Sequence, residues 1–196
     1  MKKMLAVLAL AATALFGTFS PANALVDVVE FSTGYFVPDE ASTYDEPYYR
    51  WYDEDWGWQH SAIGGTFGTA ELFISAWDVD KAYGEVDNIY AYDGATMVLL
   101  GSLNGLDGDW GYTTFTLGSN FFDDIATGLK VWIDIDSTHD YDNWAVTLAK
   151  SVLTLDGGTI PDPEPGPDPV PEPSTLLLLG GGLAGLAFAR KRFAKK

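Results

Sequence analysis

Four acidic side chains lie close together in the middle of the chain. Asp78 and Asp80 follow the apolar stretch 70–77, and Glu85 and Asp87 come after a short turn. If the strand runs on without a bulge, the first two acids point toward the core, where a charge is costly unless it is paired or binds a cation. Several oxygen ligands suit Ca²⁺, although the spacing is not that of an EF-hand. We expect either a structural Ca²⁺ site at these four residues or a solvated acidic turn.

Aromatic side chains form a second group of candidates, within the acidic and irregular stretch 37–58. An exposed aromatic face marks a binding site, and aromatic rings stack on sugar rings as in carbohydrate-binding modules. The candidate glycan-binding residues are Trp51, Tyr52, Trp56 and Trp58. The alternative is that these rings cap the ends of a hydrophobic core.

Residues for catalysis are scarce. The chain has no cysteine, no G-x-S-x-G or H-E-x-x-H motif, and only two histidines, His60 and His139. We expect His60, which follows Trp58 closely, to be packed or hydrogen-bonded. Two carboxylates suffice for glycoside hydrolysis, but among 28 acids no pair is distinguished. We therefore expect a protein that is not an enzyme; the alternative is a secreted glycan-processing enzyme on a β-sandwich scaffold.

Short strands separated by glycine turns make up the body of the chain, residues 25–157. Leu72, Ile74 and Ala76 fall on one face of a strand, and Asp134 and Asp136 fall on the solvent side of another. No capped helical pattern of ten residues occurs in the body. The fold class predicted is all-β, an antiparallel β-sandwich of jelly-roll type, with strands at 25–31, 70–77, 88–92, 96–100, 112–117, 129–136 and 144–155.

Both ends of the chain read as targeting segments. Residues 1–24 have a basic start, an apolar run and an A-x-A site ending at Ala24, which predicts a signal peptide removed by signal peptidase after Sec export. The Pro-rich linker 158–173 favours an extended stalk of about 50 Å. The apolar segment 175–189 predicts a helix of about 22 Å, short for a membrane core of about 30 Å, followed by a basic tail on the cytoplasmic side.

The last 27 residues, 170–196, combine Pro171-Glu172-Pro173, an apolar helix rich in Leu and Gly, and a basic cluster. This arrangement resembles the PEP-CTERM protein-sorting signal of bacteria that make exopolysaccharide. The resemblance implies that an exosortase recognises Pro171, Glu172 and Pro173, and that the helix anchors the chain transiently in the membrane. The body, with its D-V-D and G-E-V-D elements, is similar to a β-sandwich found in PEP-CTERM proteins of unassigned activity.

Charge narrows the choice of partners. The whole chain carries a net charge of −17, and the exported segment from Asp27 to Glu172 has four bases against 28 acids, or −24. Such a surface repels phosphate backbones, which excludes nucleic acid. We expect an exported protein of the cell surface or extracellular matrix. Its predicted role is structural or glycan-binding, in an exopolysaccharide or biofilm layer.

Overall fold

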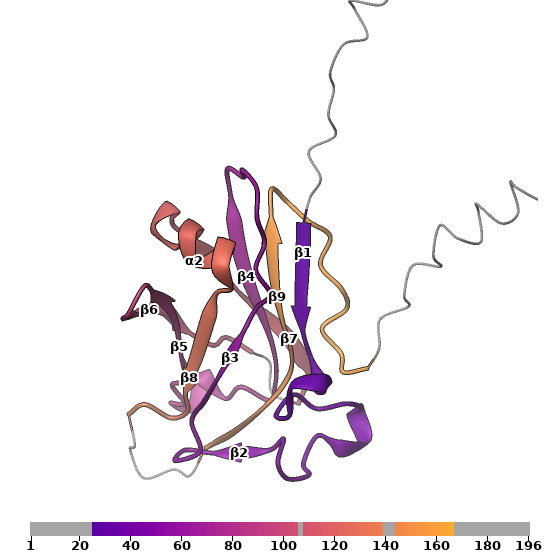
Figure 1. Cartoon of the computed structure of the whole chain (residues 1–196). Helices are drawn as coiled ribbons and strands as arrows, with labels where there is room; N and C mark the ends of the chain where they lie inside the picture. The colour runs from indigo at the N-terminus through magenta and orange to yellow at the C-terminus, as the bar shows by residue number, and fades with distance from the viewer. Residues whose placement is uncertain (1–24, 106–107, 139–143, 167–196) are drawn as a thin grey trace, which may run out of the picture.

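The structure, a computed structural model, describes residues 25–105, 108–138 and 144–166, which form two antiparallel β-sheets packed face to face (Figure 1). The first sheet has the order β1 (Leu25–Val29), β9 (Ala145–Leu155), β4 (Ala70–Trp77) and β7 (Trp110–Leu117), and the short β2 (Arg50–Trp51) also pairs with β9. The second sheet has the order β3 (Trp56–Gln59), β8 (Lys130–Asp134), β5 (Asn88–Asp93) and β6 (Thr96–Ser102).

The predicted antiparallel β-sandwich is confirmed. Leaving β2 aside, the eight strands are divided four and four, and early strands lie beside late ones in both sheets, as β1 beside β9 and β3 beside β8. This is the strand order of a jelly roll. The hairpin β5–β6 turns at Gly94 and Ala95, one position after the predicted Asp93-Gly94, and Gly94 adopts the left-handed conformation (φ 58°) that this turn requires.

The helices are short and lie between strands. Among the described residues the longest is α2 (Phe122–Thr127), six residues that place Ile125 in the core. The others are 3₁₀ turns: η1 (Phe31–Thr33), η2 (Glu40–Ser42), η3 (Lys81–Tyr83) and η4 (Ser119–Phe121). Within the described ranges no helix is long and apolar enough to cross a membrane. The predicted signal peptide, the Pro-Glu-Pro box and the helix 175–189 lie outside these ranges.

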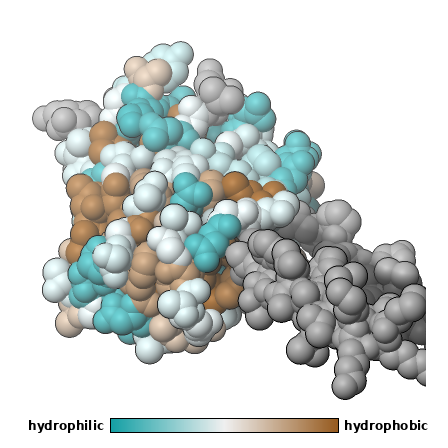
Figure 2. Space-filling model, turned by 90° about the horizontal axis from the view of Figure 1, so that it is seen from above, coloured by the Kyte–Doolittle hydropathy of each residue, from teal (hydrophilic) through white to brown (hydrophobic). Residues whose placement is uncertain are grey.

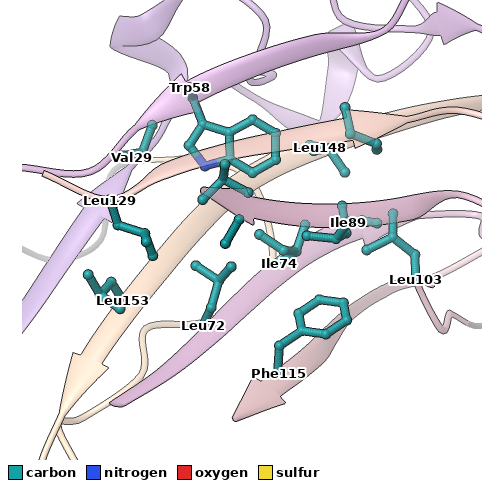
Figure 3. Packing of buried hydrophobic residues seen from close by; sticks show 14 of the residues in the cluster. Val29, Trp58, Leu72, Ile74, Ile89, Leu103, Phe115, Leu129, Leu148 and Leu153 are labelled. Atoms are coloured by element: carbon teal, nitrogen blue, oxygen red, sulfur yellow. The ribbon is translucent and has the colours of Figure 1, made fainter. Parts of the chain in front are cut away.

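Alternating side chains of both sheets fill the space between them. Leu72 and Ile74 of β4 meet Ile89 of β5 and Ile133 of β8, all at 0% exposure, and Trp58 reaches in from β3 (Figure 3). A bulge in β9, at the register shift between Ser75 and Ala76 of β4, keeps Leu148 and Leu153 on the core side although their numbers differ in parity. The same alternation brings the polar Ser151 into the interior.

Part of the outer face of the first sheet is covered by the chain itself. Ser75 Oγ donates a hydrogen bond to the carbonyl oxygen of Pro163, and Tyr112 Oη donates to that of Asp162 at 3.4 Å. Beneath them Val152 has 0% exposure. Residues 162–163 of the predicted extended stalk therefore lie against the domain, because hydroxyl donors of the sheet face bind their carbonyl oxygens. Residues 167–173 lie outside the described ranges.

Candidate functional site

The outer face of the second sheet presents aromatic side chains in two rows that cross all four strands. The strand registers place Gly57, Trp132, Tyr90 and Leu99 in one row, and Gln59, Lys130, Tyr92 and Met97 in the next. The neighbours of these residues along the strands, such as Val131, Ile133 and Ala91, are buried in the core. The period of two thus fixes which face the aromatic residues occupy.

The indole of Trp132 extends across the neighbouring strand because position 57 has no side chain. Gly57 pairs directly with Trp132, and a Cβ atom placed on Gly57 would lie 2.8 Å from Trp132 Cε3 and 2.9 Å from the carbonyl oxygen of Val131. Any larger residue would therefore force the ring away from β3. The glycine allows the indole to lie over the backbone of β3.

A hollow of about 440 Å³ lies beside this ring and is lined by Gly57, Gln59, Tyr92, Lys130 and Trp132, among others. This volume falls within the range of about 300–1,000 Å³ that is typical of ligand sites. Trp132 and Tyr92 supply ring surface, while Gln59 and Lys130 are exposed and polar. Gln59 Nε2 donates to the carbonyl oxygen of Gly128 at 3.0 Å, which orients the amide. The arrangement combines stacking surface with hydrogen-bonding groups.

The structure does not place the predicted glycan-binding residues together at the surface. Trp56 and Trp58 are 5% and 8% exposed and pack in the core, so neither offers the exposed ring that the prediction requires, although Trp58 borders the hollow. The stretch that contains them forms an inward-facing strand, β3, and the guanidinium of Arg50 covers the Trp56 ring at 5.0 Å. Trp51 is 40% exposed and Tyr52 is half-buried, and neither lines the hollow.

A Ser-His-Asp cluster that the sequence did not suggest joins β1, β9 and the loop after β3. His60 Nδ1 lies 2.8 Å from Asp27 Oδ2, and His60 Nε2 lies 2.8 Å from Ser151 Oγ. The backbone N–H of Ser61 also donates to Asp27 Oδ2, at 3.0 Å. Because a carboxylate only accepts, we assign the proton to Nδ1, and Ser151 then donates to Nε2. The expectation that His60 is hydrogen-bonded is confirmed.

Burial prevents this cluster from acting as a catalytic triad. Ser151 has 0% and His60 1% exposure, and Ser151 is flanked in the sheet by Val29 and Ile74. A nucleophile must reach a substrate carbonyl, and the hollow described above is not lined by any of the three residues. Burial raises the pKa of Asp27, but hydrogen bonds from His60 and Ser61 outweigh it and hold that pKa below its ordinary value. The cluster fixes β1 to β9 and to the loop after β3.

The four predicted Ca²⁺ ligands all come after the end of β4, and the chain changes direction there. The strand stops at Trp77, and Asp78 turns into the left-handed conformation (φ 57°), so Val79 enters the core instead of the acids. The prediction that Asp78 and Asp80 share the face of Ile74 is therefore wrong. Asp78 Oδ1 accepts a hydrogen bond from the N–H of Gly108 at 2.6 Å.

Glu85 and Asp87 form a separate buried pair, at 2% and 1% exposure. Glu85 Oε2 accepts from the N–H of Asp80, and Asp87 Oδ1 accepts from the N–H of Asp136 at 3.0 Å. Asp136, expected on the solvent side, is 2% exposed because the chain turns there (φ 45°). With both carboxyls ionised, Glu85 Oε1 and Asp87 Oδ2 have no hydrogen-bond donor.

A proton on Glu85 supplies the hydrogen-bond donor that these two oxygens lack. Burial, followed by the charge of Asp87, raises the pKa of Glu85 to about 9, and burial raises the pKa of Asp87 to about 6. Glu85 is then protonated at neutral pH and can hydrogen-bond to Asp87. Across the described ranges no group of three or more His, Cys, Asp or Glu side chains is placed to hold a metal ion. Ca²⁺ binding by Asp78, Asp80, Glu85 and Asp87 stays a prediction.

Comparison with known families identifies the end of the chain. A family model described as the PEP-CTERM protein-sorting motif matches residues 169–192, which confirms the resemblance noted for Pro171, Glu172 and Pro173. The motif implies export, processing by an exosortase and transient association with the membrane through the C-terminal region. No curated protein matches the chain.

Two solved structures are distantly similar to the chain. The coat protein of Tobacco streak virus shares 16% identity over 78% of this chain and 93% of its own, with a TM-score of 0.33. A pentameric capsid protein isolated from metagenomic phage sequences shares 16% identity over 84% of this chain and 98% of its own, with a TM-score of 0.22. At these scores neither likeness bears on function.

Proposed function

We propose that the protein is an exported, non-catalytic glycan-binding component of an extracellular polysaccharide layer, and that the hollow beside Trp132 binds the glycan. The observation that carries the proposal is the Trp132 ring held over Gly57 next to Tyr92, on an outer face that the described chain leaves uncovered. The sorting motif at residues 169–192 supports the destination, since it directs a chain to export.

The two outer faces of the sandwich differ in a way that supports binding. The first sheet is covered in part, at residues 162–163, and exposes Val26 at 39% and Val28 at 36%, whereas the second keeps Met97 at 45% and Leu99 at 54% exposure beside Tyr90 and Tyr92. The view from above, which looks onto one end of the sandwich, also shows apolar patches bordered by hydrophilic residues (Figure 2). Contiguous exposed apolar surface on a soluble domain marks an interaction site.

Sugar rings match this surface because they have apolar C–H faces and polar edges. An aromatic ring such as Trp132 packs against the C–H face, while Gln59 and Lys130 are placed to bind hydroxyl groups at the edge. The rows cross four strands, about 14 Å at the usual strand spacing. An extended oligosaccharide therefore fits better than a single sugar.

The same geometry speaks against the alternative, a glycan-processing enzyme. Glycoside hydrolysis in its usual form needs two carboxyl groups that flank the scissile bond. The described lining of the hollow contains no Asp or Glu. The one Ser-His-Asp cluster of the described residues lies inside the sandwich, where no polysaccharide reaches it.

Affinity electrophoresis of the full chain in mild detergent tests the proposal, with hydroxyethylcellulose, dextran, xanthan and alginate as probes. We expect retardation by at least one probe, weakened about tenfold or more by Trp132→Ala, since tenfold corresponds to about 1.4 kcal/mol of lost stacking. The matched control is Trp51→Ala, which removes an exposed indole outside the hollow and should bind like the wild type.

Two results would contradict the proposal. Equal weakening by Trp132→Ala and Trp51→Ala would show that the hollow is not the binding site. Shortening of a probe during incubation, measured by size-exclusion chromatography, would establish turnover and support the enzyme instead.

A further inference from the structure

We propose that the hollow selects acidic polysaccharides, in which the Lys130 ammonium binds the carboxylate of a uronic acid stacked on Trp132. This inference rests on the proposed function and names the class of glycan that the site takes.

The first observation is how the four bases between residues 25 and 166 are used. Arg50 Nε donates to the carbonyl oxygen of Glu54 at 2.7 Å, and its guanidinium lies 4.2 Å from the centre of the Tyr35 ring. Lys81 Nζ donates to Asn104 Oδ1 at 2.6 Å. Lys150 is 1% exposed. Three of the bases therefore serve the fold.

Lys130 differs from these three. It is exposed, it lines the hollow, and its ammonium has no hydrogen-bond or ion-pair partner among the described residues, in a segment, 25–166, that carries 26 acids. Its charge therefore lies, without a partner among the described residues, beside a hollow that also offers a stacking ring.

The register places this charge where a ring substituent would lie. Lys130 and Trp132 are two positions apart on β8 and share the outer face, about 7 Å along the strand. Gln59 lies directly across from Lys130 on β3, and Tyr92 follows the last β5–β8 pair on the other side. A carboxylate projects from the edge of a sugar ring, so a ring stacked on Trp132 brings it within reach of the flexible ammonium.

A charge of opposite sign at the other end of β8 favours one orientation of a bound uronic acid. Asp134 lies two positions beyond Trp132 on the same face, so base and acid flank the indole. A uronic acid on Trp132 gains an ion pair only when its carboxylate points toward Lys130, and it is repelled in the reverse orientation. The acidic body, residues 25–157 with a net charge of −20, likewise opposes anionic polymers that do not make this contact.

Isothermal titration calorimetry of the full chain tests the selectivity, with oligomannuronate as the acidic probe and cello-oligosaccharide of equal length as the neutral one, both in chelator. We expect tighter binding of the acidic probe. Lys130→Gln should weaken the acidic probe about tenfold and change the neutral one by less than about twofold, whereas Lys130→Arg should keep both. Lys81→Gln, which removes the same charge elsewhere, is the matched control and should change neither.

The outcomes separate the two proposals. Equal weakening of both probes by Lys130→Gln, or binding of the neutral probe alone, would overturn acidic selectivity while leaving glycan binding intact. Full binding of both probes by Trp132→Ala would instead overturn the proposed site itself.

Discussion

Two clusters in the interior contain carboxylates, and they differ in how the carboxylate oxygens are hydrogen-bonded. In the first, Asp27 accepts hydrogen bonds from His60 and Ser61, and His60 accepts from Ser151, so each polar group that meets the core has a partner. In the second, Glu85 and Asp87 face each other, and one oxygen of each has no donor while both are ionised. The first cluster is complete as built, and the second needs a positive charge from outside.

The pKa values express this difference. The hydrogen bonds hold the pKa of Asp27 below its ordinary 3.8, so its stabilising contribution is present above that pH and is lost as the pH falls. Burial and mutual repulsion raise the pKa of Glu85 from 4.5 to about 9. The Ser-His-Asp cluster is thus structural because it is buried. The acidic pair is where the stability of the fold depends on pH.

The largest effect is expected from breaking the first cluster at its centre. His60→Ala removes both hydrogen bonds and leaves the Asp27 carboxylate and the Ser151 hydroxyl facing a cavity. We expect the free energy of unfolding to fall by about 3–5 kcal/mol, as for other broken buried pairs. Urea unfolding of the full chain, followed by tryptophan fluorescence, measures it. A loss below about 1 kcal/mol would mean that the cluster does not hold β1 in place.

Glu85→Gln is expected to have the next largest effect, and its sign depends on pH. Between pH 4.5 and 9 the folded chain keeps a proton on Glu85 that the unfolded chain releases, so wild-type stability falls as the pH rises through this window. We expect a loss of about 3–4 kcal/mol from pH 6 to pH 9, since one proton contributes about 1.4 kcal/mol per pH unit until the pH nears 9; the melting temperature should fall by about 12 °C. Glu85→Gln keeps a neutral group there and should flatten this slope.

Differential scanning calorimetry at closely spaced pH values measures the slope. Glu40→Gln is the control, because Glu40 is exposed and its loss should leave the wild-type slope unchanged. A slope that persists in Glu85→Gln would contradict a proton shared within the pair.

Much of the fold could be predicted from local pattern. Alternation in Ala70–Trp77 predicts β4 with its bounds, and Asp93-Gly94 predicts the β5–β6 turn. The short α2 could not be predicted, because six residues contain less than two helical turns of periodicity. The contact of the proline-rich segment with the first sheet could not be predicted for another reason, since a proline-rich composition does not indicate which surface the segment contacts.

The candidate site was less accessible to sequence reasoning. Trp132 occupies the solvent-side position of an alternating strand, a signal that was present, but its role depends on Gly57, 75 positions away. Asp27, His60 and Ser151 are likewise distant in sequence and are brought together only by strand pairing. The predicted orientations of Asp78 and Asp136 were wrong for a local reason. Each residue is left-handed at a strand end, so the alternation of side chains along the strand does not continue through it.

Ser151→Ala tests the first cluster more gently. It removes one donor and leaves His60 Nε2 buried without a partner, which costs about 1–2 kcal/mol. Because both variants break the same hydrogen bond, the double variant Ser151→Ala/His60→Ala should be about 1 kcal/mol less destabilised than the sum of the two. Strict additivity in urea unfolding would show that the 2.8 Å contact contributes nothing.

The smallest effect on the melting temperature is expected from adding or removing Ca²⁺. This measurement shows whether a proton or a metal ion neutralises Glu85 and Asp87. Two carboxyl groups offer four oxygens, of which two already accept backbone N–H groups, whereas Ca²⁺ takes six to eight oxygen ligands. If the neutralising charge is a proton, 5 mM CaCl₂ or EDTA should shift the melting temperature by less than about 1 °C, at pH 6 and at pH 9 alike. A rise with CaCl₂ at pH 9 that disappears in both Glu85→Gln and Asp78→Ala would instead show that Ca²⁺ displaces the proton and draws Asp78 to the pair.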